Sequence, residues 1–81
     1  MQLQILTPEE TFYSGEAESV TLPGYMGSFQ ILRNHAPLIA SLQNGYLSFL
    51  VDGNIKTIEI ADGFVEVKDN MVTVLVDSIR K

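Results

Sequence analysis

The sequence predicts an all-β protein, and three observations lead there. Apolar and polar residues alternate with a period of two along most of the chain, whereas helical periodicity is sustained nowhere. Turn residues interrupt the alternation at short intervals. The last apolar segment, residues 71–76, is β-branched at four positions. We therefore expect about ten short antiparallel strands packed as a β-sandwich, with no long helix, because such strands need a second sheet to bury one face.

The first half of the chain supplies its strands between clear interruptions. Met1, Leu3 and Ile5 share one face, and Pro8 ends that strand because proline cannot continue a ladder. Ser14-Gly15 is read as the next turn, and Pro23-Gly24 as the end of the strand that precedes it. The strands expected between these interruptions lie at residues 1–5, 11–13, 16–22, 28–32 and 38–42.

The second half shows the strongest turn signals. Asp52-Gly53 separates two alternating segments and is the clearest hairpin in the sequence. Asn44-Gly45, Asp62-Gly63 and Asp69-Asn70 are also read as turns. The strands expected between them lie at residues 46–51, 55–60, 64–67 and 71–76. Residues 47–51 and 71–76 carry apolar side chains on both faces, so one face of each is expected to point away from the core. That face is either covered by a partner or exposed without functional consequence.

The composition excludes several function classes. Eighty-one residues have room for one core, so a single domain over residues 1–81 is expected. Cysteine is absent, which removes disulfides, thiolate metal sites and a cysteine nucleophile. Ten acidic residues against five basic ones give a net charge of −5, and the basic residues form no stripe. Binding to nucleic acid and to anionic lipid is therefore disfavoured.

Nothing in the sequence predicts insertion into a bilayer. No apolar run approaches the roughly 18 to 20 residues that span the hydrocarbon core. The N-terminus lacks the basic region of a signal segment and enters an alternating pattern at once. The protein is expected to be cytosolic or to face the cytosol, with no direct lipid insertion.

The residues that could carry catalysis are few and dispersed. His35 is the only histidine and has no second nitrogen or sulfur ligand for a zinc site. Glu16 and Glu18 would share one face of a strand and could hold a hard cation, although a solvated strand face explains them equally well. A triad of His35 with Ser28 or Ser41 lacks a nucleophile elbow, and the glycines after residue 23 lack the helix N-terminus of a phosphate loop. We predict no enzyme, no metal and no cofactor.

Residues 23–38 are the most distinctive part of the sequence. Tyr25, Met26 and Phe29 lie next to turn glycines, where a purely structural loop is usually more polar. In one interpretation Phe29 is core and Tyr25 lies flat over the sheet; in the other the segment is a protruding contact loop, since aromatic and Met side chains are enriched at interface centres. His35 is interpreted as a loop histidine that donates to a backbone carbonyl. The residues alone thus predict a small acidic β-sandwich interaction module with an unknown protein partner.

Four segments in a fixed order carry a resemblance to a known family. They are Phe12-Tyr13-Ser14-Gly15-Glu16-Ala17-Glu18, Gly27-Ser28-Phe29-Gln30-Ile31-Leu32-Arg33-Asn34-His35-Ala36-Pro37-Leu38, Asp62-Gly63-Phe64-Val65-Glu66-Val67 and Val72-Thr73-Val74-Leu75-Val76-Asp77. Together they resemble the N-terminal β-sandwich domain of the epsilon subunit of the F-type ATP synthase, in a short form without the C-terminal helical hairpin. The resemblance covers the chain from about Ile5 to Ser78.

The resemblance implies a non-catalytic central-stalk rotor subunit of a proton-translocating F-type ATP synthase. Such a subunit links the gamma subunit to the membrane c ring and couples ion flow to ATP synthesis, while ATP chemistry belongs to the beta subunits. The implied location is peripheral, at the cytoplasmic face of a bacterial energy-transducing membrane. The residues that map onto the ring-contact loop are Tyr25, Met26, Gly27, Ser28 and Phe29, and those that map onto the approach to gamma or the ring are His35, Leu38 and Ala40.

The chain also departs from the family pattern. Met26 and Ser28 stand where many members carry acidic residues, so the ring contact is expected to depend on packing more than on charge. Gln30 replaces a glycine and Arg33-Asn34 replaces a Pro-Gly turn, so the local turn is expected to differ. The family's helical hairpin, which inhibits ATP hydrolysis and in some members responds to nucleotide, has no counterpart in the sequence. Neither activity is therefore carried over, and a naturally short form is expected.

One rival function comes from another class. A small β-barrel that binds a ligand or single-stranded nucleic acid uses a basic groove with stacking aromatics on one face. The net charge of −5 argues against such a groove. The three tyrosines and four phenylalanines are dispersed along the chain, which argues against a stacking platform.

Overall fold

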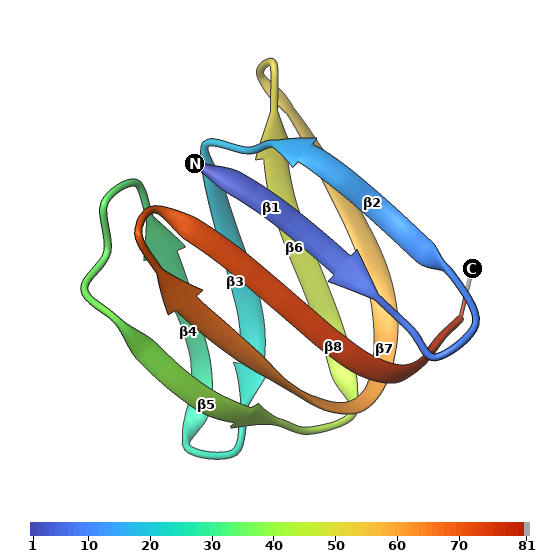
Figure 1. Cartoon of the computed structure of the whole chain (residues 1–81). Coiled ribbons are helices and arrows are strands. Elements are labelled where there is room, and N and C mark those ends of the chain that lie inside the picture. The colour runs from blue at the N-terminus through green and yellow to red at the C-terminus, as the bar shows by residue number, and fades with distance from the viewer. Residues whose placement is uncertain (81) are drawn as a thin grey trace.

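The computed structural model describes residues 1–80, and these form eight strands with no helix (Figure 1). Lys81, the last residue of the expected 1–81 domain, lies outside the described residues. The all-β fold class is confirmed. The strands are β1 Gln2–Leu6, β2 Thr11–Glu16, β3 Ser19–Gly24, β4 Gly27–Leu32, β5 Leu38–Leu42, β6 Gly45–Val51, β7 Asn54–Lys68 and β8 Met71–Arg80.

The strands lie in two layers that share the long strand β7 (Figure 1). One layer has the order β2-β1-β8-β7-β5, and the other consists of β4, β3, β6 and the first part of β7. Residues 54–60 of β7 pair with β6, and residues 59–61 and 63–68 pair with β8. Residues 63–67 also pair with β5. Strands β1 and β8 run parallel, which corrects the expectation of a wholly antiparallel sandwich; the other pairs are antiparallel.

Two of the expected turns are strand interiors. One of them merges two expected strands, since residues 55–60 and 64–67 both belong to β7, and at the other the break moves from Ser14-Gly15 to residues 17–18, between β2 and β3. Gly15 pairs with Leu3 inside β2, and Gly63 pairs with both Leu42 and Val76 inside β7. A Cβ atom at Gly63 would collide with the carbonyl oxygen of Leu75. Gly63 is therefore a glycine that lets β7 approach β8 closely, not one that reverses the chain.

The remaining turn predictions divide into two groups. Asp52-Gly53 has φ values of 50° and 78°, and Asp69-Asn70 has 51° and 59°, so both join their strands as two-residue turns with positive φ, as predicted. Asn44-Gly45 connects β5 to β6 with neither residue at positive φ. Asn44 instead accepts a hydrogen bond of 2.9 Å at Oδ1 from the backbone N–H of Asp62.

The predicted alternation correctly identifies the inner faces. Val72, Val74 and Val76 of β8 point into the core, as do Leu47 and Phe49 of β6. Complete burial of each such side chain contributes about 1.5–3 kcal/mol. The buried residues from both layers form one cluster, Met1, Leu3, Ile5, Ala17, Val20, Leu22, Ile31, Leu42, Leu47, Phe49, Ile60, Val65, Val67, Val72, Val74 and Val76.

Candidate functional site

The β3–β4 hairpin ends in a tight turn made of two large residues. Gly24 pairs with Gly27, which leaves Tyr25 and Met26 as the two turn residues. Gly27 has φ 118°, a conformation that a residue with a side chain rarely adopts. A Cβ atom at Gly24 would lie 2.8 Å from the ring of Phe29, so the ring packs directly on the glycine backbone. The two glycines thus let a bulky turn close over an aromatic ring.

The side chains at this end point in opposite directions. Tyr25 is 62% exposed and Met26 101% exposed. Phe29 is half-buried and packs against the core cluster. Phe29 is therefore a structural residue, as one interpretation held, but the exposure of Tyr25 does not fit a ring lying flat over the sheet. The turn presents an aromatic ring and a thioether to solvent.

A hollow of about 510 Å³ lies between this hairpin and β5. We call it the hairpin hollow; its lining residues are Gly24, Tyr25, Met26, Gly27, Ser28, Phe29, Leu38, Ala40 and Ser41. None of them is charged. The hollow brings together seven of the eight residues singled out from the sequence, all but His35. Gly24 and Ser41 were not assigned to this contact from the sequence, because a glycine that ends a strand and a serine within one carry no signal for a contact surface.

His35 lies apart from the hollow, in the connection between β4 and β5. Its Nδ1 donates to the carbonyl oxygen of Ala36 at 2.7 Å, and its backbone N–H donates to that of Leu32 at 3.2 Å. The interpretation as a loop histidine bonded to a backbone carbonyl is confirmed. Asn34 adopts φ 62°, a left-handed conformation that asparagine tolerates, and its N–H donates to Asn70 Oδ1 at 2.8 Å.

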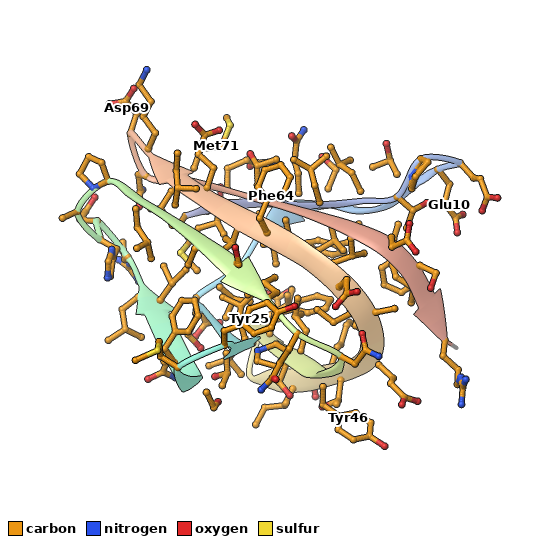
Figure 2. All side chains as sticks on the ribbon, turned by 90° about the horizontal axis from the view of Figure 1, so that it is seen from below. Glu10, Tyr25, Tyr46, Phe64, Asp69 and Met71 are labelled. Atoms are coloured by element: carbon orange, nitrogen blue, oxygen red, sulfur yellow. The ribbon has the colours of Figure 1, made fainter. Side chains whose placement is uncertain are left out.

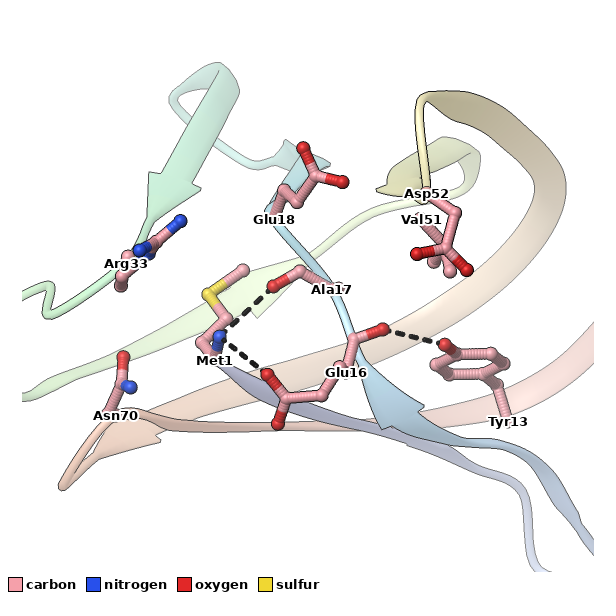
Figure 3. A pocket seen from close by; sticks show the side chains of 9 residues that line it. All are labelled: Met1, Tyr13, Glu16, Ala17, Glu18, Arg33, Val51, Asp52 and Asn70. Atoms are coloured by element: carbon pink, nitrogen blue, oxygen red, sulfur yellow. Dashed lines mark hydrogen bonds and ion pairs between the residues drawn. The ribbon is translucent and has the colours of Figure 1, made fainter.

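Glu16 and Glu18 do not form the cation site considered from the sequence. Glu16 ends β2 and Glu18 precedes β3, with the buried Ala17 between them, so the pair does not lie on one strand (Figure 3). A Glu16 carboxylate oxygen lies 3.4 Å from the Met1 ammonium, and Tyr13 Oη donates to the Glu16 carbonyl oxygen at 2.8 Å. Within residues 1–80 no three His, Cys, Asp or Glu side chains gather as a metal site would need.

Apolar side chains also lie on the outer face of the β1-β8-β7 layer. Leu6 pairs with Leu75 and Leu75 with Phe64, so these three residues form a row across the strands. Figure 2 shows Phe64 and Met71 projecting from this face, on the side opposite Tyr46. The sequence predicts apolar residues on both faces of residues 71–76: Val72, Val74 and Val76 face the core, and Leu75 lies in this outer row. In the described part of the chain, no helix is long and apolar enough to cross a membrane.

Comparisons with known proteins agree on one family. The model for the ATP synthase delta/epsilon chain beta-sandwich domain matches residues 1–81. The ATP synthase epsilon chain of Leptospira borgpetersenii is 43% identical over 77 residues, which cover 95% of this chain and 61% of that protein. The epsilon chain of Chlorobaculum tepidum is 44% identical over 78 residues, 95% of this chain and 89% of that protein.

A solved structure matches the whole chain in fold. It is a chain of the Tetrahymena thermophila mitochondrial ATP synthase, from its central stalk and c ring, with a TM-score of 0.87 and 18% sequence identity. The match covers 100% of this chain and 66% of that chain. The chain spans about three fifths of the length of curated relatives such as the epsilon chain of Leptospira borgpetersenii.

Proposed function

Because the chain belongs to the ATP synthase delta/epsilon beta-sandwich family, we propose that it is a non-catalytic central-stalk subunit of an F-type ATP synthase. In this function it links the gamma subunit to the c ring of a proton-translocating complex. Relatives more than 40% identical are named ATP synthase epsilon chains, and a structural neighbour comes from a central stalk and c ring; both support the proposal.

The observation that carries the proposal is the exposed turn above an uncharged hollow. Tyr25 and Met26 place large apolar surface in solvent where the fold requires none, which is typical of a residue pair held for contact. In our proposal Tyr25, Met26, Gly27, Ser28 and Phe29 contact the c ring. Leu38 and Ala40 line the other side of the hairpin hollow and, with His35, face gamma or the ring.

The proposed mechanism is mechanical coupling through a stiff body. Strand β7 runs through both layers, so a load applied to one layer passes to the other through continuous backbone and ladder hydrogen bonds. The close-packed core between the two layers has low compressibility. A compliant joint would store part of the torque as elastic strain, whereas a rigid sandwich transmits it from the ring to gamma.

The proposed location follows from the proposed partners. The chain acts as a single domain over residues 1–81, bound peripherally at the cytoplasmic face of a bacterial energy-transducing membrane. It is held there by the gamma subunit and the c ring, not by its own insertion into lipid.

Co-purification with the gamma subunit and the c ring of the same source tests the function. The chain is expected to elute with each partner from size-exclusion chromatography, at near equal stoichiometry with gamma. A chain that shows a β-type circular dichroism spectrum yet elutes alone in both mixtures would overturn the proposed function.

A further inference from the structure

Strand β4 has an open backbone edge. Within residues 1–80 it pairs with β3 alone. The two-residue turn makes Gly24 and Gly27 a hydrogen-bonded pair, and such pairs alternate along an antiparallel ladder. Ser28 and Gln30 therefore direct their N–H and C=O groups away from β3.

Two observed hydrogen bonds support this assignment. Pro23, the partner of Ser28, accepts at its carbonyl oxygen from Gln43 N–H at 2.9 Å, on the side of β3 away from β4. Leu32, two residues beyond Gln30, accepts at its carbonyl oxygen from His35 N–H at 3.2 Å, outside the β3–β4 ladder. Both carbonyl groups point as the alternation requires. The edge presented by Ser28 and Gln30 is thus a short, exposed template for another strand.

The edge of β4 lacks the features that usually block strand addition. Native proteins protect edge strands with charged residues, proline or bulges. At the other end of the sheet, β2 is preceded by Pro8-Glu9-Glu10, ends at Glu16 and has a register irregularity between Thr11 and Tyr13, which pair with the consecutive β1 residues Leu6 and Ile5. Strand β4 has none of these between Gly27 and Leu32. The contrast indicates that the β4 edge is kept accessible.

The hairpin hollow adjoins this edge, between β4 and β5. Three of its lining residues are partly buried and pack against the core cluster: Phe29 of β4, and Leu38 and Ala40 of β5. A strand added beside β4 would pair its backbone with Ser28 and Gln30. Since side chains alternate along a strand, the neighbouring residue of the added strand, opposite Phe29, would point into the hollow.

We propose that the β4 edge and the hairpin hollow together bind an extended segment of a protein partner by strand addition. The segment is uncharged and has an apolar side chain opposite Phe29, because no charged residue lines the hollow. Unpaired N–H and C=O groups in a row select an extended peptide over a helix or a lipid chain, neither of which has complementary backbone groups to offer. The inference rests on the proposed function in one respect, the gamma subunit as the source of the segment. It also narrows that function: the c ring contacts the exposed tip of the turn, Tyr25 and Met26, while the gamma segment reaches Ser28 and Phe29 from the strand edge.

Amide hydrogen exchange on the unmodified chain tests the proposal without a mutation. The isolated chain should exchange the amides of Ser28 and Gln30 quickly, since these groups face solvent. In the complex with the gamma subunit, both amides are expected to slow by at least about tenfold, as for amides that enter a ladder. Equally fast exchange in the complex would overturn strand addition.

Proline variants give an independent measurement. Gln30→Pro removes an outward N–H and leaves the β3–β4 ladder intact. Affinity for gamma should fall at least about tenfold, because one hydrogen bond is lost and the pyrrolidine ring of the proline blocks the path of the added strand. Gln30→Ala keeps the N–H and should bind as the parent does. Ser14→Pro is the matched proline control: Met1 and Ala17 exchange two hydrogen bonds, so Ser14 also points its N–H outward, but from β2.

The outcomes separate this proposal from the proposed function. If the parent chain binds gamma and Gln30→Pro binds equally well, strand addition is wrong and the proposed function stands. If the folded parent chain binds neither gamma nor the ring, the proposed function fails and the strand proposal with it. If the parent chain self-associates and only Gln30→Pro abolishes this, the edge pairs with a second copy of the chain, which contradicts a partner's segment.

Discussion

Two hairpin turns at opposite ends of the molecule differ in what their residues are for. The β6–β7 turn at the top of Figure 1 is Asp52-Gly53, with φ values of 50° and 78°. The β3–β4 turn at the bottom is Tyr25-Met26, with neither residue at positive φ and both largely in solvent. The upper turn uses the residues that its backbone demands. The lower turn uses residues that its backbone does not demand, which indicates selection for contact.

The largest expected effect breaks the lower hairpin itself. Phe29→Asp should reduce the free energy of unfolding by about 3–5 kcal/mol, because it removes an aromatic ring packed on the core and places a charge there. Urea unfolding followed by circular dichroism measures the loss. Gln30→Asp adds the same charge at an exposed position of β4 and should change stability by less than about 1 kcal/mol. Equal losses in the two variants would show that Phe29 is not part of the core.

Placing the lower turn's residues in the upper turn should lower stability without changing affinity for the partners. The double change Asp52→Tyr and Gly53→Met puts Met at φ 78°, where a left-handed backbone costs about 1–2 kcal/mol per non-glycine residue. Thermal unfolding should show that loss, with affinity for gamma and the ring unchanged. A gain in partner binding from this variant would mean that any exposed apolar turn suffices.

Replacing the two large residues of the lower turn should weaken binding to the c ring with little change in stability. Tyr25→Asn with Met26→Gly replaces two exposed side chains with residue types that are common in turns, so stability should stay within about 1 kcal/mol of the parent. Affinity for the c ring should fall at least about tenfold, as when central aromatic contacts are removed from an interface. The affinity is measured by titration of the purified ring. Unchanged affinity would make the lower turn as dispensable as the upper one.

The smallest expected effect concerns salt. Tyr25 and Met26 carry no charge, so raising the ionic strength from about 0.05 to 0.5 M should change the dissociation constant for the ring by less than about threefold. The same titration repeated at each salt concentration gives the slope. A steep loss of affinity would place the contact at the charged turns, such as the one that holds Asp52.

The sequence predicts the features that depend on local alternation and turn residues, and misses those that depend on contacts between strands far apart in the chain. Val72, Val74 and Val76 face the core as the period of two requires, and Asp52-Gly53 turns as its residue types require. Asp62-Gly63 carries the same kind of signal as Asp52-Gly53, yet it lies inside β7 because Gly63 meets the backbone of β8. One dipeptide signal serves both uses, and only the neighbouring strand decides between them.

The candidate site shows the same division. Tyr25, Met26 and Phe29 were identified because large apolar residues beside glycine are unusual in a turn. That Leu38 and Ala40 lie across a shared hollow from them is a result of sheet order, which places β5 beside the end of β3 through a single pair, Gly24 and Leu42. The outward backbone of β4 follows from the register of its hairpin, which the sequence does not specify.

Thiol labelling at the two turns tests the central claim most directly, since the chain contains no cysteine. Met26→Cys and Asp52→Cys each introduce one exposed thiol, at the lower and the upper turn. A maleimide should label both variants at similar rates in the isolated chain. In the complex with gamma and the c ring, the account predicts strong protection at position 26 and unchanged labelling at position 52. Labelling of both thiols in the complex as fast as in the isolated chain, or protection at position 52 alone, would contradict it.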